Sequence, residues 1–279
     1  PQGVRVSHAM PDTPYTIADL LRVMQRLRDP DGGCPWDLRQ DFQSIVPSTL
    51  EECYELAAAI EQGDYPHVAE ELGDVLFQVV FYAQLGREQS LFSFEEIVHT
   101  LVDKLLRRHP HVFADGDIEG RVEAQCEVAE VKRSWEAIKR EERAARSQRG
   151  VLDDVPVALP ALPRAQKLQK RAALVGFDWP DARAVLEKLD EERNELREAI
   201  TTGDTAAIAD EMGDLLFTCV NLARRLGLDA ESTLRHASAK FERRFRVMEA
   251  ALAEADGRGL AALTTSELEA LWVAAKARD

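Results

Sequence analysis

The sequence has few of the residues that build disulfide-bonded, zinc-binding or membrane-spanning proteins. Only four of its 279 residues are cysteines, and none of them forms a C-x-x-C pair. This spacing argues against a zinc site, and four cysteines are too few for a disulfide framework in a chain of this length. The longest strongly apolar stretch, residues 75–85, is too short to cross a bilayer. We therefore expect a cytoplasmic protein without a membrane partner.

Positive charge is also scarce. Lys and Arg number 35 against 50 Asp and Glu, which gives a formal net charge of −15. Because an acidic surface repels phosphate backbones, we expect no nucleic-acid partner. The sequence contains neither G-x-x-x-x-G-K-[ST] nor G-x-S-x-G, which excludes phosphate binding by a P-loop. A small polyphosphate could still bind through metal ions and a local basic cluster.

Strand-like alternation is rare, and helical periodicity dominates. Helix breakers predict one helix that begins at Ser48 or Thr49 and ends near residue 62, a second over residues 66–85, and a third that begins at Ser93 and ends before Pro110. Helices joined by short loops pack as antiparallel neighbours. The sequence therefore predicts an all-α fold of the helix-bundle type.

An acidic pattern, E-E-x-x-E followed by E-x-x-D, occurs twice. The first copy consists of Glu51, Glu52, Glu55, Glu71 and Asp74, and the second of Glu191, Glu192, Glu195, Glu211 and Asp214. Each member of the second copy lies 140 positions after its counterpart, and 16 of the 33 positions from residue 51 to residue 83 are identical to their counterparts. The chain is therefore a tandem duplication, and we expect two modules that each resemble a four-helix bundle.

The two modules are separated by a segment rich in helix breakers. We expect a flexible tail over residues 1–14, an N-terminal module over 15–146, a linker over 147–163 and a C-terminal module over 164–279. Gly150, Pro156, Pro160 and Pro163 mark the linker. Charged residues from 123 to 146 predict one more helix at the end of the first module.

The spacing of the carboxylates indicates a site for a hard cation. Residues three and four apart share a helix face, and a turn near Gly63 would fold the second acidic helix beside the first. A solvated acidic face is the alternative. However, residues 40–86 contain nine acidic residues and no Lys or Arg. Gly73 and Gly213 lie within the predicted helices at a cost of about 1 kcal/mol each, which suggests close packing there. We predict Mg²⁺ at both sets.

Basic and aromatic residues repeat as well. Lys104, Arg107 and Arg108 form one helix-face triplet, and Lys240, Arg243 and Arg244 form the other. Either triplet could bind phosphate oxygens or be only a charge cluster at a helix end. Trp135 and Trp272 follow their triplets at similar distances, so each could stack on a nucleobase or pack in a core. Arg28 and Arg171 also occupy matching places in the two halves, and each could reach a phosphate or cap its bundle.

Several longer motifs carry a family resemblance. They are C-P-W-D at residues 34–37, L-E-E-C-Y-E at 50–55, E-L-G-D-V-L-F-Q at 71–78, R-R-H-P-H-V-F at 107–113, V-G-F-D-W at 175–179, E-M-G-D-L-L-F at 211–217 and K-F-E-R-R-F at 240–245. Together they resemble the MazG family of nucleoside triphosphate pyrophosphohydrolases, over nearly the whole chain. One departure is Gln40-Asp41-Phe42, where the family usually has Q-T-H.

The resemblance implies conversion of a nucleoside triphosphate (NTP) to the monophosphate (NMP) and pyrophosphate, with magnesium. Its metal ligands fall on Glu52, Glu55, Glu71 and Asp74, and on Glu192, Glu195, Glu211 and Asp214. Its nucleotide contacts fall on residues 240–244 and Trp272; Lys188, Lys104, Arg107 and Arg108 complete the predicted substrate-binding set. It further implies that the C-terminal copy is the more active.

The predicted mechanism is a metal-assisted attack of water on a phosphoanhydride. Glu51 and Glu191 are the candidates to orient or deprotonate that water. We expect low base selectivity, because the distinctive residues address phosphate, and a homodimer, because related folds complete their bundles by pairing. A nucleotide-binding regulator without turnover, or a helical scaffold, is the alternative, since a metal cluster and a basic face would serve binding equally.

Overall fold

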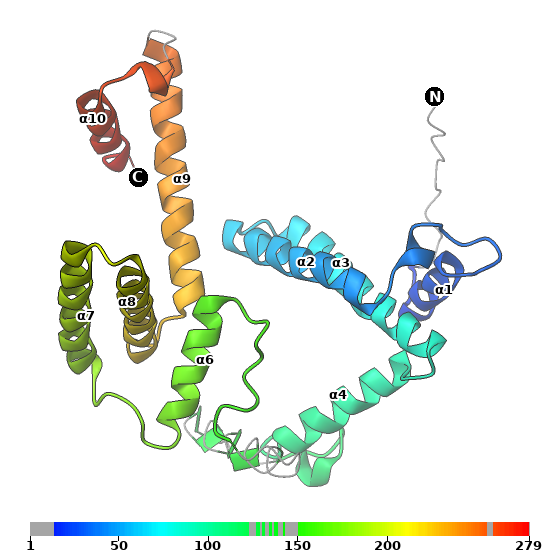
Figure 1. Cartoon of the computed structure of the whole chain (residues 1–279). Coiled ribbons are helices and arrows are strands. Elements are labelled where there is room, and N and C mark those ends of the chain that lie inside the picture. The colour runs from blue at the N-terminus through cyan, green and yellow to red at the C-terminus, as the bar shows by residue number, and fades with distance from the viewer. Residues whose placement is uncertain are drawn as a thin grey trace. The chain divides into compact units, whose positions relative to one another are not determined.

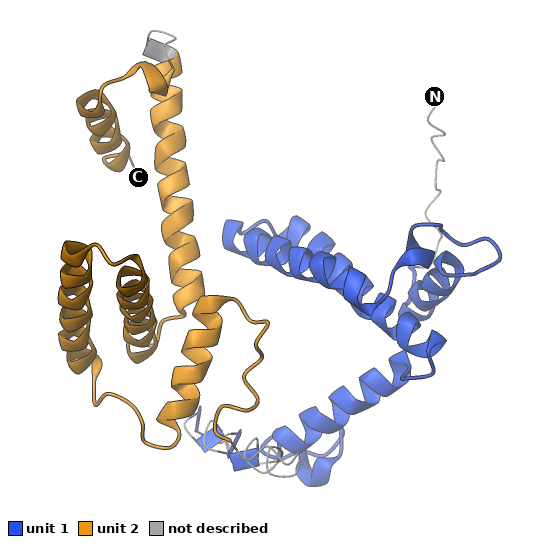
Figure 2. Cartoon of the chain, viewed as in Figure 1, with its two compact units in different colours: residues 1–139 blue, residues 140–279 orange. Residues whose placement is uncertain are grey.

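The computed structural model describes residues 14–122, 150–255 and 259–278, and single positions between 127 and 142. It divides into two compact units, residues 1–139 and 140–279 (Figure 2). Within the described residues every regular element is helical, which confirms the all-α prediction. The predicted helix over residues 123–146 and the tail over residues 1–13 fall largely outside the described residues. The exact limits of the linker stay a prediction.

Unit 1 is built around an antiparallel helix pair. Its helices are α1 (Ile17–Leu27), α2 (Phe42–Gln62), α3 (Tyr65–Glu88) and α4 (Phe94–Arg108), with short 3-10 turns at Asp37–Arg39 and Ala114–Gly116. Helices α2 and α3 lie side by side as a hairpin, and α4 turns back from the end of α3 at an angle to it (Figure 1). The α2–α3 hairpin carries all five residues of the first acidic copy.

Helix α2 begins earlier than the sequence predicts. Asp41 accepts a hydrogen bond from the backbone N–H of Ser44 at 2.8 Å, and the Ser44 hydroxyl accepts one from the backbone N–H of Asp41 at 2.9 Å. This capping box begins the helix at Phe42. Pro47 then lies inside the helix, where it removes only one backbone hydrogen bond. The predicted start at Ser48 or Thr49 is therefore wrong, because the cap outweighs the proline.

The core of unit 1 fixes α1 against α2 and α3. Its buried residues are Met24, Ile45, Val80, Phe81 and Leu85. Above this core, the buried guanidinium of Arg28 donates to both carboxylate oxygens of Glu88, at 2.8 and 2.6 Å, and to the backbone carbonyls of Asp37 and Gln40. Arg28 thus ties the loop before α2 to the end of α3, which settles its role as a structural clamp.

Unit 2 repeats this plan. Its helices are α6 (Ala161–Ala173), α7 (Ala182–Thr202), α8 (Thr205–Arg225), α9 (Ala230–Ala255) and α10 (Thr265–Lys276), with a 3-10 turn at Leu260–Ala262. Helices α7 and α8 form the second hairpin, α9 turns back from the end of α8, and α10 packs on the far part of α9 (Figure 1). None of the described helices is both long and apolar enough to cross a membrane.

The two hairpins turn in the same way. The first helix of each pair ends at a glycine in the left-handed region, Gly63 with φ 71° and Gly203 with φ 73°. The next residue, Asp64 or Asp204, then caps the second helix with its side chain. This repeated turn sets the register in which the acidic residues of the two helices face each other.

The second arginine of the matching pair is also structural. Arg171 forms an ion pair with Asp154. Arg224 and Arg225, at the end of α8, both hold Asp178 in the loop before α7. Burial alone would raise the pKa of Asp178, but its hydrogen bond to Arg224 and the two positive charges outweigh burial and keep that pKa below its usual range.

Candidate metal and nucleotide site

The α2–α3 hairpin gathers carboxylates from both of its helices. Glu52 and Glu55 project from α2 and Glu71 from α3, and one oxygen from each lies within 4.8 Å of the others. Burial raises the pKa of Glu52, and the carboxylates of Asp74 and Glu55 raise it further. Three of the four predicted ligands are therefore brought together in space, and the fourth, Asp74, is not part of this group but lies close enough to act on Glu52.

Glu71 provides the test of whether this set suits a cation. Its side chain is only 8 % exposed, and Nε2 of His67 lies 2.7 Å from its Oε1. The other oxygen, Oε2, is buried and has no hydrogen-bond partner among the described residues. A buried carboxylate oxygen without a partner is unfavourable unless a cation or donor meets it. All the candidate ligand atoms of this set are carboxylate oxygens, and one of them is buried without a partner among the described residues. Such a set fits a hard divalent cation such as Mg²⁺.

The α7–α8 hairpin gathers the second set in the same way. Oxygens of Glu192, Glu195 and Glu211 also lie within 4.8 Å of one another. Burial raises the pKa of Glu211, and the charges of Glu195 and Glu192 add to that rise. Asp214 adds a smaller effect of the same sign, so it too acts on this cluster.

A lysine joins the second set. Nζ of Lys188 lies 2.8 Å from Oε1 of Glu192 and 2.9 Å from Oε1 of Glu191. The hydrogen bonds to Glu192 and Glu191 raise the pKa of Lys188 above its usual range. The predicted phosphate-binding lysine and the predicted water-activating Glu191 are therefore neighbours beside the candidate metal ligands.

The two helix glycines do not pack as we expected. Apart from the backbone of its own helix, a Cβ built on Gly73 or on Gly213 would meet no atom of the described residues within 4 Å. The inference of close packing inside the module is therefore wrong. Each glycine instead leaves an open surface on the helix, between the Glu and the Asp of its E-x-G-D turn.

The basic triplets lie on the helices that diverge from the hairpins. Lys104, Arg107 and Arg108 are in the second half of α4, where Nη1 of Arg107 pairs with Asp103 at 2.7 Å. Lys240, Arg243 and Arg244 are in the middle of α9. Each triplet thus lies on a helix that diverges from the hairpin of its own module (Figure 1).

Both tryptophans contact the arm that carries their triplet. Nε1 of Trp135 donates to the backbone carbonyl of Arg108 at 2.8 Å, and its ring packs edge-on against His109 with 5.2 Å between centroids. On α9, the guanidinium of Arg244 lies 6.0 Å from the ring centroid of Trp272. In both modules the tryptophan thus contacts the helix that carries its triplet, although the individual contacts differ.

Sequence reasoning overlooked His67. The histidine lies four residues before Glu71 on α3, so the two share a helix face, and this spacing was the available signal. The second module has Ala207 at the matching position. The two sites therefore have different neighbours, His67 in the first and Lys188 in the second.

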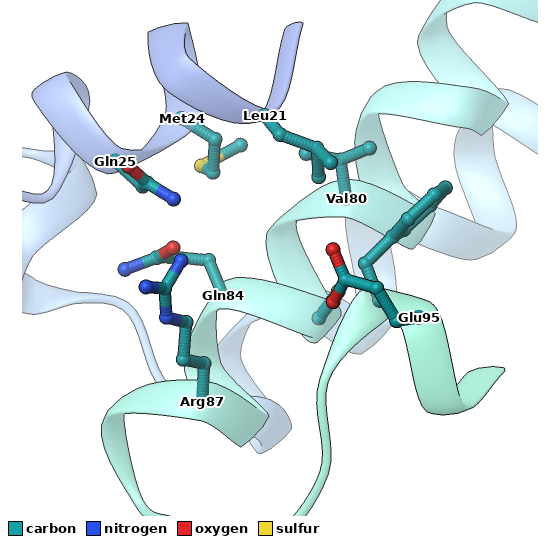
Figure 3. Close-up of a pocket in the computed structure, with 9 residues that line it drawn as sticks. Leu21, Met24, Gln25, Val80, Gln84, Arg87 and Glu95 are labelled. Carbon is teal, nitrogen blue, oxygen red and sulfur yellow. The ribbon is translucent and has the colours of Figure 1, made fainter. Parts of the chain in front are cut away.

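A separate cavity lies between α1, α3 and α4. It holds about 50 Å³ and is lined by residues that include Met24, Val80, Gln84, Arg87 and Glu95 (Figure 3). Ligand pockets usually occupy about 300–1,000 Å³. This cavity is therefore too small for a nucleotide and plays no part in the site.

Known proteins share both modules. The sequence model of the MazG nucleotide pyrophosphohydrolase domain matches residues 40–113 and 181–247, which contain one acidic copy each. The nucleoside triphosphate pyrophosphohydrolase of Escherichia coli K12 is 50% identical over 267 residues, which are 94% of this chain and 98% of that protein. The protein named nucleoside triphosphate pyrophosphohydrolase/pyrophosphatase MazG of Thermotoga maritima is 43% identical over 270 residues, 97% of this chain and 99% of that protein. The chain therefore belongs to the MazG family of nucleoside triphosphate pyrophosphohydrolases.

Proposed function

We propose that this chain hydrolyses nucleoside triphosphates to the monophosphate and pyrophosphate, depends on Mg²⁺ and has broad base specificity. The observation that carries the proposal is the pair of carboxylate sets, in each of which three glutamate oxygens from two helices lie within 4.8 Å of one another. The names of the two bacterial relatives support the same reaction.

The metal would be held by four carboxylates in each module. These are Glu52, Glu55, Glu71 and Asp74 in the first module, and Glu192, Glu195, Glu211 and Asp214 in the second. Bound Mg²⁺ would neutralise the negative charge that develops on the triphosphate. The open surface at Gly73 and at Gly213 leaves room beside these ligands for a phosphate chain to approach.

The other residues would position water and substrate. Glu191 is 58 % exposed and is held by Lys188 at 2.9 Å, which suits a carboxylate that orients the attacking water; Glu51 takes this role in the first module. Lys188 would release its carboxylates to contact a phosphate. The triplets on α4 and α9 would bind further phosphate oxygens, and Trp272 would stack on the base. Stacking tolerates every base, since each has an aromatic face.

We also propose a homodimer in which the hairpins pair. On α3, Leu72 and Leu76 are 52 % and 39 % exposed, and the matching Met212 and Leu216 on α8 are 42 % and 54 % exposed. Both modules thus expose the same apolar face beside the glycine, and a second copy could cover it. Light scattering at micromolar concentration tests this proposal, and a monomer contradicts it. The cytoplasmic setting stays a prediction.

One assay separates the enzyme from a nucleotide-binding regulator or scaffold. The chain is incubated with each of the common NTPs and Mg²⁺, and NMP, pyrophosphate and orthophosphate are quantified. We expect equal amounts of NMP and pyrophosphate from several NTPs, and no turnover after chelation. Release of orthophosphate and NDP alone contradicts the proposed reaction, and binding without any product supports the regulator.

A further inference from the structure

The two carboxylate sets differ in their charge balance. In the second set, one ammonium group, that of Lys188, contacts Glu191 and Glu192 at 2.9 and 2.8 Å. The position 140 residues earlier is Ser48, which cannot supply a positive charge, and residues 40–86 contain no Lys or Arg at all. The fold places Ser48 on α2 as it places Lys188 on α7, so no ammonium group takes this place beside the first set among the described residues.

Glu71 shows the consequence for the first set. Its carboxylate is buried, and Oε2 lacks a hydrogen-bond partner within the described part of the chain. The neighbouring His67 meets only Oε1, at 2.7 Å. In the second set the buried carboxylate is Glu192, the counterpart of Glu52, and it is bonded to Lys188. Only the first set therefore keeps a buried anionic oxygen that no other group of the described chain satisfies.

We propose that the N-terminal set binds a divalent cation without nucleotide, whereas Lys188 compensates the C-terminal set, which takes its cation only together with the nucleotide. The proposal rests on the assignment of both sets as metal sites in the proposed function. It makes the N-terminal module a permanently loaded site and the C-terminal module a site that loads when substrate arrives.

The physical reason is competition between two cations for the same oxygens. A cation that enters the second set must approach Glu192 against the positive charge of Lys188, or displace that charge into solvent. At these distances one unit charge changes cation affinity by about tenfold or more. A triphosphate reverses the balance, because its oxygens offer Lys188 an alternative partner and offer the metal additional ligands.

The test is a titration of the full chain with Mn²⁺ at about pH 8, without nucleotide, in which electron paramagnetic resonance reports free Mn²⁺. We expect one class of sites at least about tenfold tighter than the other. Glu55→Gln should weaken the tighter class and Glu195→Gln the weaker one, which assigns each class to its module. A non-hydrolysable NTP analogue should tighten the weaker class more than the other.

Two reciprocal variants move the positive charge of Lys188 from the second set to the first. Lys188→Ser should tighten the weaker class by about tenfold, and Ser48→Lys should weaken the tighter class by a similar factor. Arg183→Ser is the matched control: it removes one positive charge from the same helix, where Arg183 pairs with Glu187 at 3.8 Å, and should change neither class. If Ser48→Lys does not fold by circular dichroism, Lys188→Ser alone decides the matter.

Two results overturn the inference: equal affinities in the original chain, or a weaker class that Lys188→Ser leaves unchanged. Pyrophosphate release is measured separately with Mg²⁺ and NTP. Turnover with equal affinities contradicts this inference alone and leaves the proposed function intact. Two distinct classes that respond to the variants as expected, in a chain that releases no pyrophosphate, support this inference and contradict the proposed function.

Discussion

The ring of Trp272 on α10 packs against the ring of Phe241 on α9, with 5.3 Å between centroids and 45° between planes. Phe241 follows Lys240 directly and stacks on Phe245 at 5.9 Å. The basic triplet of α9 therefore shares its arm with three aromatic rings. A platform of this kind can bind a base by stacking while the neighbouring cations bind phosphates.

Replacing Trp272 should weaken nucleotide binding more than it slows the chemical step. Stacking on an aromatic ring contributes about 1–3 kcal/mol per base, so we expect Trp272→Ala to raise KM by about tenfold or more with a small change in kcat. Steady-state kinetics with ATP and GTP measure this. Trp36→Ala, at a tryptophan that is 58 % exposed in the other module, is the control. An unchanged KM in a folded variant would mean that Trp272 only packs the arm.

Loss of one carboxylate should have a larger effect in the second module. We expect Glu195→Ala or Asp214→Ala to lower NTP turnover by about a hundredfold. Without one ligand the metal ion is displaced, and its positive charge no longer lowers the activation barrier by several kcal/mol. Glu55→Ala and Asp74→Ala should cost less, since the first module departs from the family at Asp41 and Phe42. Pyrophosphate release by folded variants measures the difference. Greater damage from the first-module changes would reverse the assignment of the two modules.

The clamp between α1 and α3 should matter for stability. Arg28→Met removes two hydrogen bonds to Glu88, which keeps its bond from Gln84, and two to backbone carbonyls. Charged hydrogen bonds of this kind are worth about 2–3 kcal/mol when a partner is lost. Urea unfolding of unit 1 measures the loss. Arg22→Ala removes an exposed ion pair with Asp19, which solvent screens, and should change stability far less. Equal losses in both variants would refute the clamp.

The same clamp should make stability depend on pH. Its hydrogen bond from Arg28 holds the pKa of Glu88 below the ordinary value of 4.5. A carboxylate with a lowered pKa in the folded state stabilises the protein above its unfolded pKa, and this stabilisation is lost as the pH falls through the lower folded pKa. The stability difference between the original chain and Arg28→Met should therefore be constant near neutrality and shrink below about pH 4.5. A difference that grows on acidification would contradict the assignment.

Glycine substitutions should separate backbone effects from contacts. Gly73→Ala adds a Cβ that, apart from the backbone of its own helix, meets no atom of the described residues within 4 Å, so in the monomer it should stabilise α3 by about 0.5–1 kcal/mol. Gly63→Ala, at the turn between α2 and α3, should destabilise by about 1 kcal/mol, because the φ of 71° at Gly63 disfavours a side chain. Thermal unfolding measures both. If Gly73→Ala destabilises the protein and weakens a dimer, the open face is a contact between copies.

Local sequence signals were sufficient for much of this protein. The duplication, the helical class, the turn at Gly63 and the helix that Ser93 caps all follow from spacing, capping and breaker residues, whose effects extend over only a few positions. The proximity of Glu52 to Glu71 also followed, because a tight turn between two helices leaves few alternatives. Local rules failed at the start of α2, where a capping box at Asp41 competed with Pro47 and prevailed.

Only the tertiary structure decided which side chains form hydrogen bonds and ion pairs with one another. Nothing local distinguishes an arginine that binds phosphate from one that clamps a core, yet Arg28 is buried and paired with Glu88, 60 residues away. The open faces at Gly73 and Gly213 likewise depend on what lies around them in space. So does the buried Oε2 of Glu71, which has no hydrogen-bond partner among the described residues. Burial and pairing depend on residues far apart in sequence, so only the packed chain determines them. The duplicated acidic pattern that predicted the metal site can instead be read from the sequence itself.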